Sequence, residues 1–119
     1  MIHSAKIAVV GAGGVGSCCL EYLAAAGVKE LLVIDSDNVE VQNLHRQVIH
    51  SEPCDGQAPN KAVSAVQRLR QLNSSVVYET ITQRILPENI AQLNQYNLDV
   101  VCDCSDNPET RQCVAEYCF

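Results

Sequence analysis

The sequence predicts an α/β fold, with a mostly parallel sheet and flanking helices. Short apolar runs alternate along the chain with segments of helical periodicity, and strands that alternate with helices form parallel sheets. A glycine cluster joins the first apolar run to the first helical segment. The 119 residues contain no repeat, low-complexity stretch or linker, and their length suits one domain. We therefore expect a single domain over residues 1–119.

The first predicted unit is a strand, a helix and a second strand. Residues 6–10 read KIAVV, an apolar run typical of a strand buried on both faces. A helix is predicted over residues 15–26, with Gly27 as its terminator. Residues 31–34 read LLVI and form the second buried strand, which Asp35 ends. The helix is expected to bury one apolar stripe, made of Val15, Cys19, Leu23 and Ala26.

The second part of the chain continues the same alternation. A helix is predicted over residues 59–72, and strands over residues 76–80 and 100–104. A short helix is expected within residues 87–96, and a last helix over residues 108–117. The apolar positions that recur at helical spacing in the 59–72 segment are Ala62, Ala65, Val66, Leu69 and Leu72.

Composition excludes several classes of protein. The net charge is −6, and the eight lysines and arginines are scattered, whereas a nucleic-acid-binding domain usually carries a basic face. No apolar run approaches the roughly 20 residues that span a bilayer. The first residues lack the pattern of a signal peptide. We expect no nucleic-acid partner, no membrane partner and a cytoplasmic location.

Cysteines are frequent but do not form a metal-binding pattern. No C-x-x-C pair occurs, so the usual zinc spacing is absent. An odd number of cysteines in a chain of this kind argues against a disulfide framework, and small buried thiols are common in helices and strands. Reduced structural thiols are therefore expected at Cys18, Cys19, Cys54, Cys102, Cys104, Cys113 and Cys118.

The glycine cluster predicts a nucleotide site. Gly11, Gly13 and Gly16 form a G-x-G-x-x-G motif between a strand and a helix. Glycine lets the backbone turn tightly and approach a phosphate, and the helix N-terminus attracts the anion. Asp35 follows 19 residues after Gly16, where a carboxylate typically accepts hydrogen bonds from a ribose. Taken alone, this motif is the dinucleotide fingerprint of an NAD-dependent oxidoreductase, and it does not identify the nucleotide.

Residues further along favour a nucleoside triphosphate over NAD. Arg46 offers a fork of donors to phosphate oxygens, and Asn43 suits a phosphate or a metal-bound water. Lys61 supplies a point charge for the β and γ phosphates, and Asp106 follows the fourth strand, where it is placed to hold magnesium. The structural alternatives are solvated surface charges for Arg46 and Lys61 and a helix cap at residues 106–108.

Four segments together resemble the ThiF/MoeB/ubiquitin-activating superfamily, including the eukaryotic adenylyltransferase-sulfurtransferases. They are GAGGVGS at 11–17, YLAAAGV at 22–28, DSDNVEVQNLHRQ at 35–47 and DCSDNPETR at 103–111. The resemblance covers nearly the whole chain. It implies a Rossmann-like ATP-binding domain, here the first half of a ThiF-type nucleotide-binding domain.

The resemblance also implies a reaction and a set of site residues. Such enzymes bind Mg-ATP and a ubiquitin-like or sulfur-carrier protein that ends in Gly-Gly, and they convert its terminal carboxylate into an acyl-adenylate with release of pyrophosphate. By the family pattern, Arg46, Lys61 and Asp106 serve catalysis, and Asp106 holds Mg²⁺ with Asn107 beside it. The implied nucleotide-binding residues are Gly11, Gly13, Gly14, Gly16, Asp35, Asp37, Gln42, Asn43, Leu44, His45, Arg46, Lys61, Asp106 and Asn107.

The chain departs from the family pattern at several places. Gln42 stands where relatives usually carry a small residue, and Lys61 lies two residues further from Gly56 than the family lysine does. An N-terminal arginine segment is missing, and zinc is implied only in segments beyond Phe119, together with a catalytic cysteine. We expect a portion of an enzyme that is inactive alone and a homodimer when complete.

Three alternative functions stay open. They are a non-catalytic scaffold for an active partner, an NAD-dependent oxidoreductase, and a tRNA-modifying relative that dehydrates a threonylcarbamoyl group.

Overall fold

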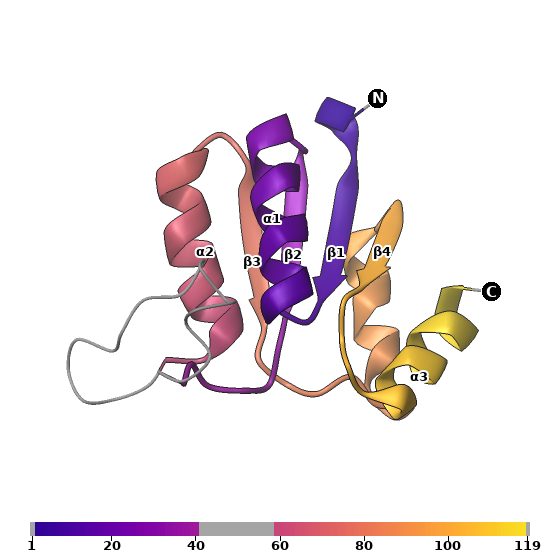
Figure 1. The fold of residues 1–119 in the computed structure, drawn as a ribbon. Coiled ribbons are helices and arrows are strands. Elements are labelled where there is room, and N and C mark those ends of the chain that lie inside the picture. Colours follow the sequence, from indigo (N-terminus) through magenta and orange to yellow (C-terminus); the bar gives the residue numbers. More distant parts are fainter. Residues whose placement is uncertain (1, 41–58, 119) are drawn as a thin grey trace.

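A computed structural model describes residues 2–40 and 59–118, and it shows a parallel sheet with helices on both faces (Figure 1). The strand order is β3-β2-β1-β4, and each neighbouring pair is parallel. The predicted α/β class is therefore confirmed. The strands are β1 at Lys6–Val10, β2 at Glu30–Ile34, β3 at Val77–Ile81 and β4 at Val100–Asp103.

The helices divide between the two faces of this sheet. Helices α1 (Gly14–Ala26) and α2 (Lys61–Leu72) cover one face, and α3 (Pro108–Cys118) lies on the other (Figure 1). The short helix expected within residues 87–96 is a 3-10 helix, η3, at Ile90–Tyr96. A 3-10 turn at Ile2–Ser4 precedes β1. The strand order reverses at β1, because β2 and β4 pair with its opposite edges.

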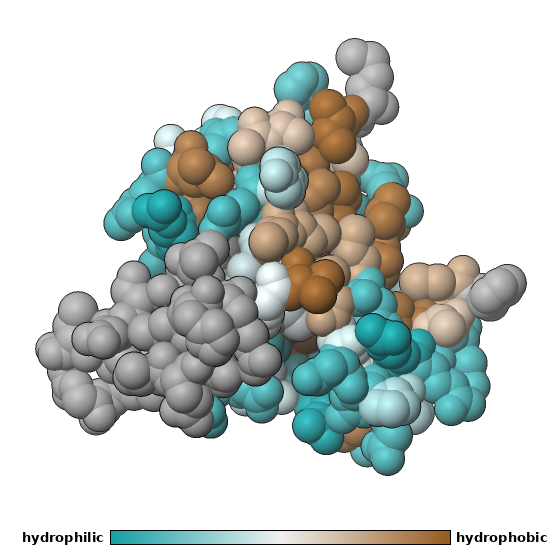
Figure 2. Space-filling view, viewed as in Figure 1, coloured by the Kyte–Doolittle hydropathy of each residue, from teal (hydrophilic) through white to brown (hydrophobic). Residues whose placement is uncertain are grey.

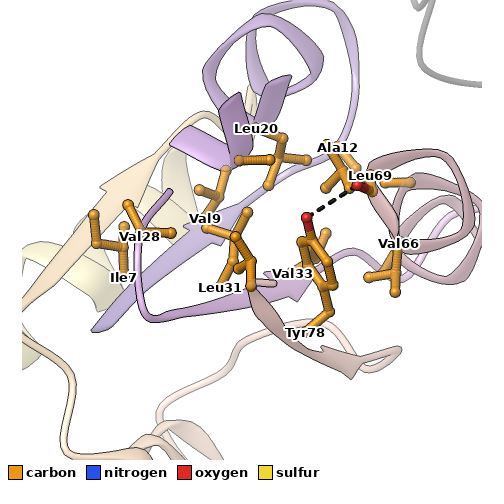
Figure 3. Packing of buried hydrophobic residues seen from close by; sticks show 14 residues of the cluster. Ile7, Val9, Ala12, Leu20, Val28, Leu31, Val33, Val66, Leu69 and Tyr78 are labelled. Atoms are coloured by element: carbon orange, nitrogen blue, oxygen red, sulfur yellow. Dashed lines mark hydrogen bonds between the residues drawn. The ribbon is translucent and has the colours of Figure 1, made fainter. Parts of the chain in front are cut away.

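Alternating side chains of the strands build two separate cores. Ile7 and Val9 of β1 join the cluster beneath α1 and α2 (Figure 3), whereas Ala8 and Val10 join the cluster beneath η3 and α3. Strand β2 divides in the same way. The central strands are thus buried on both faces, as their continuous apolar runs predicted.

Helix α1 does not pack through the predicted stripe. Val15 is 72% exposed and Ala26 is also exposed, so the predicted stripe is wrong at both ends. The side chains of Cys19 and Leu23 are only partly buried. The residues that face the sheet are smaller on average, and this brings the helix backbone close to β1. These buried residues are Gly16, Ser17, Leu20 and Ala24.

Local signals fix where α1 ends and where α2 begins. Gly27 ends α1 in the left-handed conformation with φ of 79°, as its position predicted. Asn60 is the N-cap of α2, and its side-chain oxygen accepts the backbone N–H groups of Ala62 and Val63. Pro59, expected within the first helical turn, therefore lies just before the helix.

A buried tyrosine links the end of α2 to β3, and its removal should lower stability. The Tyr78 hydroxyl lies 3.0 Å from the Leu69 carbonyl oxygen (Figure 3) and 2.7 Å from that of Asn73. We expect Tyr78→Phe to lower the free energy of unfolding by about 1 kcal/mol, because both acceptors lose a donor. Urea denaturation measures the change. Tyr22→Phe is the control, since Tyr22 is 79% exposed, and an equal effect of both substitutions would contradict the role of the buried hydroxyl.

Candidate functional site

A cleft of about 880 Å³ lies at the carboxyl edge of the sheet. Ligands of open α/β sheets bind at this edge, where the strand order reverses. Segments that follow all four strands line it, together with the start of α2. The lining residues that the sequence predicted as site residues are Gly11, Gly13, Gly14, Asp35, Asp37, Lys61, Asp106 and Asn107.

The glycine loop is closed by contacts that admit no side chain. Gly11 has φ of +99°, and a Cβ on it would lie 2.9 Å from the Cys104 carbonyl oxygen. A Cβ on Gly16 would lie 1.8 Å from the Gly11 carbonyl oxygen. Contacts below 3.0 Å between such atoms essentially do not occur in proteins. The motif glycines Gly11 and Gly16 are therefore required by the turn itself, and the loop packs directly against the end of β4.

The start of α1 presents backbone donors to the cleft. Gly13 is the N-cap residue and, having no side chain, makes no capping hydrogen bond of its own. The first N–H groups of a helix have no partner within it, and they carry the positive end of the helix dipole. Gly13 and Gly14 line the cleft at this point. The geometry suits a phosphate group or another anion.

Asp35 organises the cleft wall next to the glycine loop. Its Oδ2 accepts the backbone N–H of Ala12 at 2.8 Å, and its Oδ1 accepts the N–H of Asp37 at 2.8 Å. Each carboxylate oxygen keeps a second lone pair, so Asp35 can also accept a hydrogen bond from a hydroxyl group of a ligand. The Asp35 carbonyl oxygen accepts a hydrogen bond from the side-chain amide nitrogen of Asn60. This contact links the end of β2 to the start of α2.

Lys61 is buried at the first residue of α2. Its side chain is 8% exposed and lines the cleft, and no residue in the described ranges pairs with its ammonium group. The backbone holds it in place, because its N–H donates to the Asp37 carbonyl oxygen at 2.8 Å. Lysine is rarely buried without a partner. A buried lysine whose charge faces a cleft indicates an anionic ligand.

The segment after β4 supplies Asp106 and Asn107. Asn107 has the structural role considered above, since its side-chain oxygen accepts the backbone N–H groups of Glu109 and Thr110 at the start of α3. Asp106 is exposed on the cleft. Arg111 steadies the loop, because its Nε donates to the Ser105 carbonyl oxygen at 3.0 Å. Asp106 is thus the acidic side chain on this loop that can approach a bound cation.

Some predicted residues lie outside the described part of the chain, and some cleft residues were not predicted. Gln42, Asn43, Leu44, His45 and Arg46 lie outside the described residues, as does Cys54. Among the unpredicted residues, Gln83, Arg84 and Ile85 follow β3 and lie outside every motif, so only their position after a predicted strand was a signal. The other unpredicted residues are Val10, Val15, Ile34, Ser36, Asn38, Glu40, Cys104, Ser105 and Thr110, most of which lie within the motif segments.

Carboxylates outnumber cations on the described walls of the cleft. The cleft residues include the acidic Asp35, Asp37, Glu40 and Asp106, and the basic Lys61 and Arg84. Within residues 2–40 and 59–118, no group of three or more histidine, cysteine or acidic side chains could hold a metal ion. Mg²⁺ bound to a nucleotide typically takes one or two carboxylates, with phosphate oxygens and water as its other ligands. A single carboxylate such as Asp106 fits that pattern.

The cysteines only partly meet the expectation of buried thiols. All those in the described residues are free, but Cys18 and Cys118 are exposed, whereas Cys113 is buried. Cys19, Cys102 and Cys104 are partly buried. Burial raises the pKa of each of these three thiols above its usual value.

Comparison with known proteins decides the family. The model of the ThiF family matches residues 1–119. The chain belongs to the ThiF family. It is 44% identical over 117 residues to the adenylyltransferase and sulfurtransferase MOCS3 of Xenopus laevis, and 43% identical over 118 residues to the adenylyltransferase and sulfurtransferase UBA4 of Lodderomyces elongisporus. Each alignment covers 98% of this chain and 25% of the relative.

A solved structure supports the same assignment. The tRNA N6-threonylcarbamoyladenosine dehydratase TcdA of E. coli, in complex with ATP, matches with a TM-score of 0.88 and 33% identity. The match covers 98% of this chain and 47% of TcdA. The chain therefore spans about a quarter of the curated relatives and about half of this structure. Among the described residues, no helix is long and apolar enough to cross a membrane.

Proposed function

We propose that this chain is the ATP-binding part of an enzyme that adenylates the C-terminal glycine carboxylate of a ubiquitin-like or sulfur-carrier protein. The carboxylate attacks the α-phosphate of ATP, and an acyl-adenylate and pyrophosphate form. The observation that carries the proposal is the cleft itself, where an uncapped glycine loop lies beside a buried lysine. The MOCS3 and UBA4 relatives support it, because both are adenylyltransferases.

Each wall of the cleft has a role in this proposal. The glycine loop and the start of α1 hold phosphate oxygens through backbone N–H groups. Asp35 accepts a ribose hydroxyl, and Lys61 neutralises the β and γ phosphates. Asp106 would hold Mg²⁺, and the ion would supply positive charge to stabilise the leaving pyrophosphate. Catalysis then consists of positioning and electrostatic stabilisation, with little covalent work by the protein.

The residues outside the described ranges complete the proposed site. Asn43 and Arg46 act on the phosphates, in keeping with the family resemblance. Gln42, Leu44 and His45 accompany them on the same segment, and Asp37 lies where β2 leads into it. Arg46 would also offset the excess of carboxylates on the described cleft walls, since its guanidinium binds phosphate through two parallel hydrogen bonds.

A second candidate function is the dehydration of a threonylcarbamoyl group on tRNA. The fit to TcdA favours it, with a TM-score of 0.88. Sequence identity is lower, at 33% against 44% for MOCS3, and we therefore prefer a protein carboxylate as the acceptor. A non-catalytic scaffold is less well supported, because a scaffold has no need of a buried lysine on an open cleft. An NAD-dependent oxidoreductase rests on the glycine motif alone.

The partners follow from the proposed reaction. The substrate protein ends in Gly-Gly, and the complete enzyme is a cytoplasmic homodimer that uses no nucleic acid.

The first test is the choice of nucleotide. Isothermal titration of the complete protein with ATP and with NAD should give binding of ATP in the presence of Mg²⁺ and none of NAD. Asp106→Asn should weaken the dependence of ATP binding on Mg²⁺, because it removes the charge that attracts the cation. The matched control is Asp99→Asn, since Asp99 lies at the opposite end of β4, where its side chain accepts the N–H of Lys6. Binding of NAD instead of ATP would overturn the proposal.

The acceptor is tested separately. The carrier protein with an intact Gly-Gly end should drive exchange between ATP and pyrophosphate, and a carrier that lacks the last glycine should not. Exchange driven by tRNA in place of the carrier would favour the dehydratase class.

A further inference from the structure

Three cysteines from two elements meet beside the nucleotide cleft. Cys19 lies on α1, Cys102 on β4, and Cys104 directly after β4. All three side chains pack against the same core beneath α1, and the Cys19 thiol is near enough to Cys102 and Cys104 to influence the same titration. Cys102 and Cys104 are two residues apart along an extended segment, so they point to the same face of the sheet. The thiols of Cys102 and Cys104 therefore both lie near the thiol of Cys19 on α1.

This thiol cluster, made of Cys19, Cys102 and Cys104, is partly open to solvent. All three side chains are half-buried, and they pack against the edge of the core beneath α1. On this face of the sheet α1 and α2 lie over the other strands, and no described helix lies over β4 (Figure 1). The corresponding surface between α1 and β4 is largely apolar (Figure 2). A small oxidant can therefore reach these neighbouring thiols.

The cluster also touches the glycine loop. Cys104 lines the cleft, and a Cβ on Gly16 would lie 3.6 Å from the Cys104 Cβ. Gly11 packs against the Cys104 backbone on the other side of the loop. A movement of α1 toward β4 should therefore also displace the loop that faces the ligand, because Cys104 lies close to both Gly11 and Gly16.

We propose that the thiol cluster is an oxidation site, at which peroxide converts Cys19 and one of the two β4 thiols into a disulfide that loosens the nucleotide site. A thiolate attacks the peroxide and becomes a sulfenic acid, with release of water. The neighbouring thiol then attacks the sulfenic sulfur, and a second water leaves. Two thiols and one hydrogen peroxide thus give one disulfide and two waters. The third thiol stays reduced and can exchange with the disulfide.

The charges around the cluster set its response to pH. Burial raises the pKa of all three thiols, and Asp103 beside Cys104 raises it further at that position. The thiolate is the reactive form, so little of it exists near neutral pH. The rate of disulfide formation should therefore rise with pH up to and beyond the usual thiol pKa. Exposed Cys18, adjacent in sequence, offers an internal comparison.

Peptide mapping tests the proposal directly. The complete protein is treated with hydrogen peroxide, its remaining thiols are alkylated, and it is digested with trypsin without reduction. The expected product joins peptide 7–29 to peptide 85–111. It should form in the wild type and in the matched control Cys18→Ala, and it should be absent in Cys19→Ala. Absence of the joined peptide in the wild type, or its presence in Cys19→Ala, would overturn the proposal.

The effect on the nucleotide site rests on the proposed function and is measured on the same samples. We expect the oxidised protein to bind Mg-ATP about 10- to 100-fold more weakly, because displacements near 1 Å have effects of this size at ligand sites. Dithiothreitol should restore binding, and Cys19→Ala should be insensitive to peroxide. Equal affinity before and after oxidation would overturn the coupling to the nucleotide site. Failure of the reduced protein to bind ATP would instead count against the proposed function, while the peptide map would still stand.

Discussion

Gly16→Ala is expected to remove nucleotide binding and to destabilise the fold. The added Cβ would lie 1.8 Å from the Gly11 carbonyl oxygen and 2.7 Å from the Gly11 carbonyl carbon. Both are backbone atoms, so no side-chain rotation relieves the clash. On its other side Gly11 lies close to the Cys104 backbone, which limits the room into which it can retreat. To relieve the clash, either α1 must move away from the glycine loop, or the loop must move away from the end of β4.

The expected loss of unfolding free energy is about 3 kcal/mol, at the upper end for overpacking, because the obstacle is backbone. Urea denaturation followed by circular dichroism measures this loss, and isothermal titration with Mg-ATP measures the binding. Cys18→Ala is the matched control, since Cys18 is an exposed residue of the same helix. A Gly16→Ala protein with wild-type stability and affinity would show that the loop can rearrange without loss.

The glycine loop was predictable because the features that require it are local. A turn that needs glycine at Gly11 and Gly16, followed by a carboxylate at Asp35, is contained in one strand-helix-strand unit. The apolar runs likewise predicted the two central strands, β1 and β2, since both are buried on both faces and show no polar alternation. These features depend on neighbours in the chain, and the structure places them as expected.

Features that depend on distant parts of the chain were not predictable in the same way. Hydropathy selected Val15 for the buried stripe of α1, but the helix approaches the sheet closely and instead buries Ser17, which bonds to its own helix backbone. The position of Gln83 and Arg84 on the cleft depends on how β3 pairs with β2. No local pattern encodes these contacts. The meeting of Cys19 with the thiols of β4 is of the same kind.

The sequence predicted Lys61 as a phosphate-binding residue, but it gave no sign that the side chain is buried. Lysine at the start of a predicted helix is ordinarily exposed, and its positive charge is not favoured near a helix N-terminus. The structure nevertheless buries its side chain on the cleft, with no paired charge in the described ranges. A buried, unpaired charge lowers the stability of the unliganded protein. Such a residue is expected at a site where ligand binding requires the charge.

Lys61→Met should therefore change stability and binding in opposite directions. Methionine keeps the length of the buried stem and removes the charge, so the free energy of unfolding should stay unchanged or rise. Affinity for Mg-ATP should fall by roughly 100-fold, which corresponds to about 3 kcal/mol for a charged donor. Affinity for AMP should change little, because AMP lacks the β and γ phosphates assigned to Lys61. Lys29→Met is the matched control, since Lys29 is exposed just before β2, at the opposite edge of the sheet. Equal losses for ATP and AMP would show that Lys61 supports the fold of the cleft rather than the terminal phosphates.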